Sequence, residues 1–278
     1  IREAQPLALA PPVARHGGGD LVVFIDDEGR LTLEDDDPIT VAVADATALE
    51  GTGTISLDLT LDRASAGAVS IDLMTLDGSA TAGDDYMPLM TTVTFAPGEQ
   101  SRSLSVSLID DTINEPTKLL MASLSNPSAG QGAGQILAAA PATLIILDND
   151  ALEVTVSDQV INEGDGSGVV NASLTLTLSR ASARPIRVAL ETVDGTATVA
   201  DQDYVALMQD VDFVPGTTTA SVTLTIQSDD INEAEEQLRV ELTPARDDGA
   251  GFVAVPDVTA APPAVITIVN DDQSEPMI

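Results

Sequence analysis

Apolar and polar residues alternate in several stretches of the chain. Residues 55–61 alternate Ile and Leu with Ser, Asp and Thr, and residues 104–108 alternate Leu and Val with Ser. Residues 172–178 and 222–226 show the same period of two in the second half. Successive side chains of a strand point to opposite faces, so this period predicts strands with one buried face. Pro-Gly and Asp-Gly turn signals separate these strands and no long helical period occurs, which predicts antiparallel β-sandwiches of an all-β fold.

The chain carries one ordered set of motifs twice. The string TLDGSATAGDDY at 75–86 matches TVDGTATVADQDY at 192–204. The later motifs keep their order in both halves: FAPG at 95–98 and FVPG at 213–216, DDTINE at 110–115 and SDDINE at 228–233, LDND at 147–150 and VNDD at 269–272. We therefore predict two tandem sandwiches, a first copy at 38–150 and a second copy at 151–272, followed by a tail at 273–278. In each Pro-Gly pair, we expect the Gly to accept the positive φ of a type II turn.

The N-terminal segment resembles the end of a preceding copy. The string RLTLEDDDP at 30–38 is similar to the last strand and acidic exit of each copy. Residues 21–25 and 30–34 predict a β-hairpin, and the Pro- and Gly-containing residues 1–20 predict a flexible lead-in. An isolated hairpin is at best marginally stable. We therefore expect segment 1–37 to be the remnant of a longer array, or to pair with a sheet edge of this chain or of a neighbouring molecule.

The composition excludes most catalytic chemistry. Lys and Arg number 11 and Asp and Glu number 45, which gives a net charge of −34. Such a surface repels nucleic-acid phosphates and anionic lipid, and it favours cations or basic partners. With no Cys and one His, the chain lacks thiol nucleophiles, Cys-ligated zinc and the usual base of a serine hydrolase. Apolar residues make up 44%, enough for folded cores, so we predict a folded protein that is not an enzyme.

Localisation is inferred indirectly. The longest apolar stretch, residues 135–147, is short and is interrupted by Pro141, so no membrane insertion is predicted. The sequence begins at Ile1 and shows no charged-then-apolar leader, which indicates a processed product or a cut fragment. An acidic, Lys-poor chain with repeats favours an extracellular or cell-surface location for a secreted protein.

Acidic residues concentrate in a few predicted turns of each copy. If the strands form sandwiches, these turns lie at one end and gather their carboxylates. Like charges so close raise one another's pKa values and oppose folding unless a cation compensates. Calcium is the natural cation, because it takes six to eight oxygen ligands with loose geometry. The candidate ligands of the second copy are Glu163, Asp194, Asp229, Asp230, Glu233, Glu236, Asp271 and Asp272. The alternative is that these residues serve turns and deter aggregation at strand ends.

The ordered motifs of both copies resemble the Calx-beta domain. The resemblance implies an immunoglobulin-like sandwich of seven strands, with calcium bound by loops at one end. Members of this family occur in the regulatory domains of sodium/calcium exchangers and in tandem within bacterial surface and adhesive proteins. Carried over by position, the implied first-copy ligands are Glu50, Asp77, Asp110, Asp111, the carbonyl of Ile113, Glu115, Asp148, Asn149 and Asp150.

The two copies depart from the family pattern differently. Lys118 stands in the first copy where the family has a second late-loop Glu, which puts an ammonium group where an oxygen is expected. The second copy keeps this Glu as Glu236, but it has Ser228 and Asn270 where the family has Asp. We therefore expect the first copy to bind fewer or weaker ions than the second.

Three classes of function are open at this point. The first is a non-enzymatic, extracellular structural or adhesive segment with calcium-stiffened tandem sandwiches. Through segment 1–37 it would assemble into filaments with other copies or neighbouring repeats by strand addition. The alternative is a calcium-sensing regulatory module of a larger protein. A glycosidase using paired carboxylates is the third class, which the absence of Trp and the 2% aromatic content disfavour.

Overall fold

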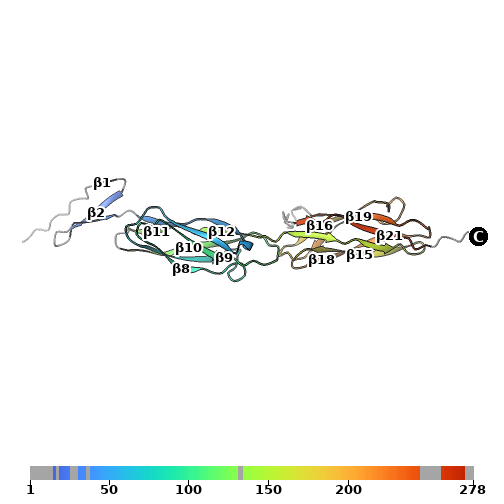
Figure 1. Ribbon diagram of the computed structural model, residues 1–278, viewed down its shortest axis with the longest axis horizontal. Coiled ribbons are helices and arrows are strands. Elements are labelled where there is room, and N and C mark those ends of the chain that lie inside the picture. The colour runs from blue at the N-terminus through green and yellow to red at the C-terminus, as the bar shows by residue number, and fades with distance from the viewer. Residues whose placement is uncertain are drawn as a thin grey trace, which may run out of the picture. The chain divides into compact units, whose positions relative to one another are not determined.

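The computed structural model describes residues 38–130, 134–244 and 258–272, and the backbone of 15–16, 19–25 and 31–35. The chain divides by its contacts into a first unit, Ile1–Asp110 with Thr117–Leu147, and a second unit, Asp111–Pro116 with Asp148–Ile278. Each unit contains one β-sandwich, so the predicted all-β fold with two sandwiches is confirmed (Figure 1). Among the described residues, no helix is long and apolar enough to cross a membrane.

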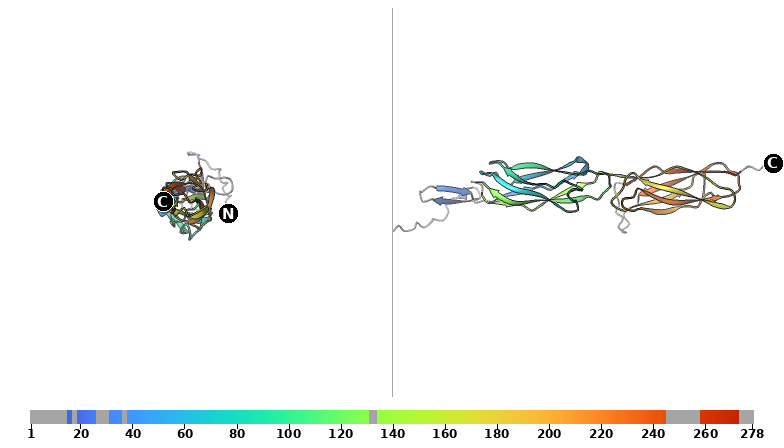
Figure 2. Two further views of the ribbon diagram at one scale, coloured as in Figure 1. Left: turned by 90° about the vertical axis from the view of Figure 1, so that its right-hand side faces the viewer. Right: turned by 90° about the horizontal axis from the view of Figure 1, so that it is seen from below.

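The first unit pairs a five-stranded with a four-stranded sheet. The strand orders are β5-β12-β10-β7-β8 and β11-β4-β6-β9. Figure 2 shows the strands of this unit from two further sides. The strands are β4 (Ile39–Val43), β5 (Ala46–Leu49), β6 (Thr54–Leu61), β7 (Val69–Asp77), β8 (Met90–Phe95), β9 (Ser101–Ser107), β10 (Lys118–Ala129), β11 (Ile136–Ala138) and β12 (Ala142–Leu147), with a 3-10 helix η1 at Glu50–Thr52.

The second unit repeats this arrangement. Its sheets have the orders β14-β21-β19-β16-β17 and β18-β15-β13-β20. The strands are β13 (Leu152–Val156), β14 (Gln159–Asn162), β15 (Gly168–Leu178), β16 (Ile186–Val193), β17 (Met208–Phe213), β18 (Thr219–Ser228), β19 (Glu236–Pro244), β20 (Val258–Ala260) and β21 (Ala264–Val269).

The expected seven strands become nine in each sandwich because the first and last strands are split. In the first unit, β4 lies in the four-stranded sheet, whereas β5 joins the five-stranded one. The last strand divides in the same way into β11 and β12. Each half of the last strand pairs in parallel with a half of the first strand: β11 with β4, and β12 with β5. Each sandwich is therefore mixed, and not wholly antiparallel as predicted. The second unit shows the same two parallel pairs.

The period of two in the sequence corresponds to alternating burial. Strand β6 alternates exposed and buried residues along its whole length, as predicted for 55–61. Tyr86 and Phe95 are among the largest fully buried side chains of the first core, and Tyr204 and Phe213 hold the same place in the second. Burial of these side chains from both sheets provides the main driving force for folding.

The Pro-Gly turns are confirmed. Gly98 and Gly216 have φ values of 81° and 82°, which disfavour any side chain. Hydrogen bonds from Glu99 N to Ala96 O (2.9 Å) and from Thr217 N to Val214 O (3.0 Å) close the turns.

The N-terminal segment forms a separate three-stranded sheet. Strand β2 (Gly19–Ile25) pairs antiparallel with β3 (Leu31–Asp35), with Leu21 opposite Asp35 and Ile25 opposite Leu31. This is the predicted hairpin. Strand β1 (Arg15–His16) pairs with the start of β2, so part of the expected lead-in is strand. The rest of residues 1–20 and the tail at 273–278 lie outside the described residues.

Candidate metal centre

A buried tyrosine anchors the loop after the Asp-Gly pair in both units. The hydroxyl of Tyr86 donates to Asp77 Oδ1 (2.6 Å), and that of Tyr204 donates to Asp194 Oδ1 (2.5 Å). The same carboxylate oxygens accept backbone N–H groups farther along each loop, from Ala82 at 2.9 Å and from Val199 at 3.2 Å. Asp77 and Asp194, predicted as metal ligands, therefore hold their loops together.

The tyrosine hydroxyls stay protonated. Burial, together with the neighbouring Asp, raises the pKa of both Tyr86 and Tyr204 to about 12. Each hydroxyl is thus a permanent donor to its carboxylate at neutral pH.

The Gly of each Asp-Gly pair lets the loop lie against the neighbouring strand. A Cβ on Gly78 would lie 2.5 Å from the carbonyl oxygen of Leu119. A Cβ on Gly195 would lie closer still to the carbonyl oxygen of Gln237. The approach lets Ala80 N donate to Leu119 O at 2.8 Å. The loop is therefore tied to β10 in the first unit and, in the same way, to β19 in the second.

The residue before each tyrosine is an aspartate that the sequence analysis did not select. Asp85 Oδ2 accepts from Thr81 N (2.6 Å), and Asp203 Oδ2 accepts from Thr198 N (2.7 Å). These hydrogen bonds fix each carboxylate in its loop. The available signal was the Asp-Tyr dipeptide that both copies share.

Asp203 belongs to a cluster of carboxylates in the second unit. Oxygens of Asp203, Glu233 and Glu236 all lie within 4.8 Å of one another. A hollow of about 10 Å³ beside them is also lined by Glu163 and Asn270. A volume of this size holds one water molecule or one ion. The structure thus brings together three predicted ligands, Glu163, Glu233 and Glu236, with Asp203 and Asn270.

The pKa values of three glutamates at this cluster are raised. Burial and the charges of Asp229 and Glu233 raise the pKa of Glu163 to about 7. Burial, a hydrogen bond with Asp203 and the surrounding negative charges raise the pKa of Glu236 to about 7. The pKa of Glu233 is raised as well, by burial and by Asp229. Burial and mutual repulsion thus disfavour the fully ionised state of this cluster when no cation compensates its charge.

A second acidic neighbourhood surrounds Asp272. Burial and the charges of Asp230, Asp165 and Asp271 raise the pKa of Asp272. Its Oδ2 atom is buried and accepts no hydrogen bond in the described part of the chain. Asp165 was not among the predicted residues. Two further predicted ligands, Asp229 and Asp271, accept backbone hydrogen bonds.

Those backbone contacts are local. Asp229 Oδ1 accepts from Ile231 N at 2.6 Å, and Asp271 Oδ1 accepts from Gly164 N at 2.8 Å. They shape the loops that carry Glu163 and Glu233, as the turn alternative of the sequence analysis expects.

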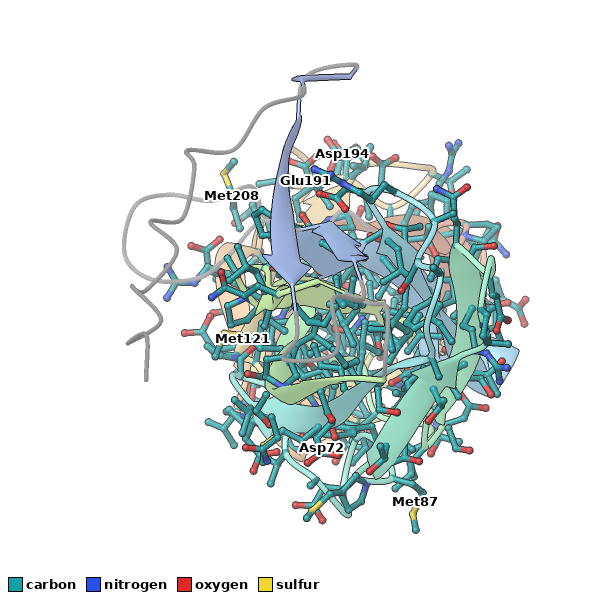
Figure 3. The ribbon with its side chains drawn as sticks, turned by 90° about the vertical axis from the view of Figure 1, so that its left-hand side faces the viewer. Asp72, Met87, Met121, Glu191, Asp194 and Met208 are labelled. Atoms are coloured by element: carbon teal, nitrogen blue, oxygen red, sulfur yellow. The ribbon has the colours of Figure 1, made fainter. Side chains whose placement is uncertain are left out.

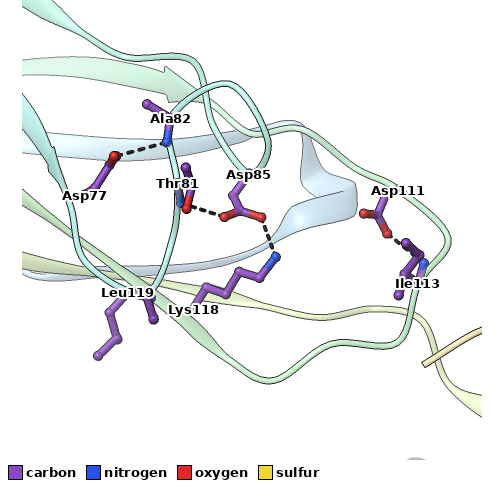
Figure 4. Close-up of polar contacts among 9 residues, drawn as sticks. Asp77, Thr81, Ala82, Asp85, Asp111, Ile113, Lys118 and Leu119 are labelled. Carbon is purple, nitrogen blue, oxygen red and sulfur yellow. Dashed lines mark hydrogen bonds and ion pairs between the residues drawn. The ribbon is translucent and has the colours of Figure 1, made fainter. Parts of the chain in front are cut away.

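The first unit replaces one carboxylate of the cluster by an ammonium group. Lys118 Nζ forms an ion pair with Asp85 Oδ1 (Figure 4). Their side chains are 17% and 11% exposed, so the pair is largely shielded from water. Lys118 and Asp85 correspond in the repeat to Glu236 and Asp203. In the first unit, the ammonium group of Lys118 therefore neutralises the carboxylate of Asp85.

The other ligands predicted for the first copy are divided between the two units. Glu50, Asp77 and Asp110 belong to the first unit, and Glu50 is buried within the 3-10 helix. Asp111, Ile113, Glu115, Asp148 and Asp150 belong to the second unit. Asp111 Oδ1 accepts from Ile113 N at 2.7 Å (Figure 4). A joint ligand role for these residues stays a prediction.

Asn114 is the centre of a buried polar network in the second unit. Its side chain is fully buried, and Nδ2 donates to Asp148 Oδ2 (3.0 Å) and to Asp150 O (2.9 Å). Its backbone N–H donates to Ala181 O at 3.0 Å. Asp150, predicted as a metal ligand, forms an ion pair with Arg180. The sequence analysis selected neither Asn114 nor Arg180.

A family model and several known proteins match this chain. The model described as Calx-beta domain matches residues 34–150 and 148–272. Sodium/calcium exchanger 2 of Homo sapiens is 27% identical over 208 residues, which cover 70% of this chain and 22% of that protein. Sodium/calcium exchanger 1 of Felis catus is 28% identical over 211 residues, which cover 70% and 21%. The chain thus spans about a fifth of the length of these relatives.

Solved structures also match. The CBD12 structure from CALX1.2 matches with a TM-score of 0.39 and 20% identity, covering 82% of this chain and 99% of that one. The calcium binding domain CBD12 of CALX1.1 matches with a TM-score of 0.40 and 22% identity, covering 81% and 98%.

Proposed function

The chain belongs to the Calx-beta domain family, and from this premise we propose that its second unit binds calcium at Asp203, Glu233 and Glu236. The observation that carries the proposal is the convergence of their three carboxylates within 4.8 Å beside an ion-sized hollow. Glu163 and the side chain of Asn270 line the same hollow and extend the oxygen set. All of these donors are oxygens, which suits a hard divalent cation.

The electrostatics support a resident cation. Glu163 and Glu236 have pKa values raised to about 7, so the empty cluster is unfavourable when fully ionised. A divalent ion would supply the missing positive charge and neutralise the mutual repulsion. Calcium fits better than magnesium because the carboxylates and the amide oxygen come from four loops and the first residue of β19, which offers many ligands in irregular positions.

We propose a calcium-responsive regulatory module of a larger, non-enzymatic assembly as the function. The relatives that support it are sodium/calcium exchangers, which this chain matches over about a fifth of their length. In this proposal, ion binding at the second unit orders the loops that hold Glu163, Asp203 and Glu233. A partner domain would bind differently to the ordered and the unordered loops, and so respond to calcium.

Thermal melting of the whole chain tests the calcium site. We expect calcium to raise Tm relative to chelator, and magnesium to raise it much less. At a free calcium concentration 100-fold above Kd, the gain is about 2.7 kcal/mol. Glu236→Gln removes one charged ligand and should reduce the calcium effect. An identical Tm in calcium, magnesium and chelator would contradict the proposal.

The separate β1–β3 sheet supports a second candidate function. It pairs with neither sandwich sheet in the described residues, so its edge strand β3 suits strand addition to another molecule. In this proposal the chain is an extracellular adhesive segment that assembles into filaments, with calcium stiffening the tandem sandwiches. Sedimentation of the chain with and without residues 1–37 tests it. Oligomers that persist after the deletion would exclude strand donation.

A further inference from the structure

The outer face of the five-stranded sheet in the first unit carries a continuous apolar stripe. Along β7, β8 and β10, Met74 lies opposite Met90, and Met121 lies opposite Leu76. Directly opposed residues share a face of a sheet. The stripe continues through β12 to β5, where Leu119 lies opposite Ile145 and Leu147 opposite Leu49. We call these eight residues the apolar stripe.

The stripe is open to solvent. Met74, Met90, Leu119, Met121 and Leu49 are 36%, 80%, 42%, 41% and 45% exposed. The other three members are half-buried. Contiguous apolar patches of this kind mark interaction sites, and flexible Met side chains adapt to different partner surfaces.

The second unit provides an internal comparison, because five of its eight matching positions are polar. The other three stay apolar, as Met208, Val193 and Val269. By strand register, Glu191 corresponds to Met74, Gln237 to Leu119 and Arg239 to Met121. Asn162 stands in place of Leu49. Figure 3 labels Met121 of the first unit and the cross-strand neighbours Glu191 and Met208 of the second. The same fold therefore does not require an apolar stripe, which points to a role outside folding.

The net charge of the chain favours one kind of partner for the stripe. Among the outward-facing residues of these five strands, Asp72 is the charged one in the described part of the chain. Hydrogen bonds from Thr92 and Asn126 lower the pKa of Asp72, so it stays ionised. The chain as a whole carries a net charge of −34. This field attracts a cationic partner and repels an anionic one.

We propose that the apolar stripe binds an amphipathic segment of another protein, with apolar side chains on one face and Lys or Arg around them. A second copy of this chain is disfavoured, because two chains that each carry a net charge of −34 repel each other. Anionic lipid is disfavoured for the same reason. The inference is independent of calcium, since no residue of the stripe lies in the metal cluster.

Exchange of residues between the two units tests the proposal. The triple variant Met74→Glu, Leu119→Gln and Met121→Arg gives the first unit the side chains that the second unit already accommodates. It adds one negative and one positive charge, so the net charge stays at −34. The mirror variant Glu191→Met, Gln237→Leu and Arg239→Met also leaves the net charge unchanged and creates the stripe in the second unit.

The probe is a fluorescent amphipathic peptide of Leu and Lys, with a Glu-for-Lys version as its control. Anisotropy at physiological salt should show binding of the Lys peptide and not of the Glu peptide. We expect the triple variant to weaken binding about tenfold or more, and the mirror variant to add a second site. Circular dichroism verifies that both variants are folded.

Three results would overturn the proposal. Equal affinity of the wild-type chain and the triple variant would mean that the peptide responds to charge alone. A wild-type dimer in sedimentation that the triple variant abolishes would assign the stripe to a second copy. Binding to phosphatidylcholine vesicles that the triple variant abolishes, without peptide binding, would assign it to a lipid surface.

Discussion

Lys118 and Asp85 form an ion pair in the first unit, where the second unit has the two acids Glu236 and Asp203. One substitution thus separates a neutralised ion pair from a pair of acids whose repulsion a bound cation would relieve. A lysine contributes a fixed positive charge and no metal ligand. The two units therefore share a loop structure but differ in charge at this position, and we expect them to differ in ion binding.

Lys118→Glu should convert the first unit to the acidic form. Without calcium we expect a loss of about 1–3 kcal/mol, because a shielded ion pair becomes a repulsion. Calcium should restore much of this loss. Calorimetry should show stronger calcium uptake than in wild type, with Lys118→Gln as the control that removes the charge without adding a ligand. Unchanged uptake in Lys118→Glu would contradict the assignment.

Tyr204→Phe should weaken calcium binding as well as stability. The hydroxyl of Tyr204 holds Asp194 and so the loop that carries Asp203. Loss of a buried hydrogen bond to a carboxylate costs about 1.5–3 kcal/mol. The matched control, Tyr86→Phe, should destabilise to a similar degree and leave the second-unit affinity unchanged. Terbium luminescence measures that affinity, and equal affinities in the two variants would show that the tyrosine does not position the site.

Stability without calcium should fall as pH rises through neutrality. Glu163 and Glu236 ionise near pH 4.5 in the unfolded chain, but their pKa values are raised to about 7 in the folded protein. Their stabilising contribution is therefore complete below pH 4.5 and is lost as pH rises through 7.

Tm measured in chelator should thus be higher at pH 5 than at pH 8, and calcium should recover most of the difference. The double variant Glu163→Gln and Glu236→Gln serves as the control, because it removes both titrating groups and should flatten the profile. A wild-type Tm that rises between pH 5 and pH 8 in chelator would refute the assignment.

Asn114→Ala should be strongly destabilising, unlike the same change at Asn232. Asn114 is fully buried, and its removal leaves the groups that it contacts without that partner. We expect a loss of about 2–3 kcal/mol. Asn232 occupies the matching place in the second copy but is exposed, so Asn232→Ala should cost about 0.5 kcal/mol or less. Urea denaturation measures the loss of unfolding free energy in each variant. Equal losses in the two variants would contradict a stabilising role for the Asn114 network.

The sequence by itself determined the architecture. The period of two placed the strands, the Pro-Gly pairs placed their turns, and the repeated motifs revealed two copies. These features depend on local backbone preference and on burial of one strand face, which each stretch of sequence carries on its own.

Tertiary structure decided which carboxylates act together. Asp194 was predicted as a ligand, yet its oxygen holds Tyr204, while Asp203, nine positions later, joins Glu233 and Glu236. A carboxylate can accept a hydrogen bond from a backbone N–H, a hydroxyl or an ammonium group, and it can also bind a metal ion. Which one it meets depends on how loops distant in sequence approach each other, and no local pattern encodes that distance. The apolar stripe has the same origin, because residues from five strands form one surface when the sheet aligns them.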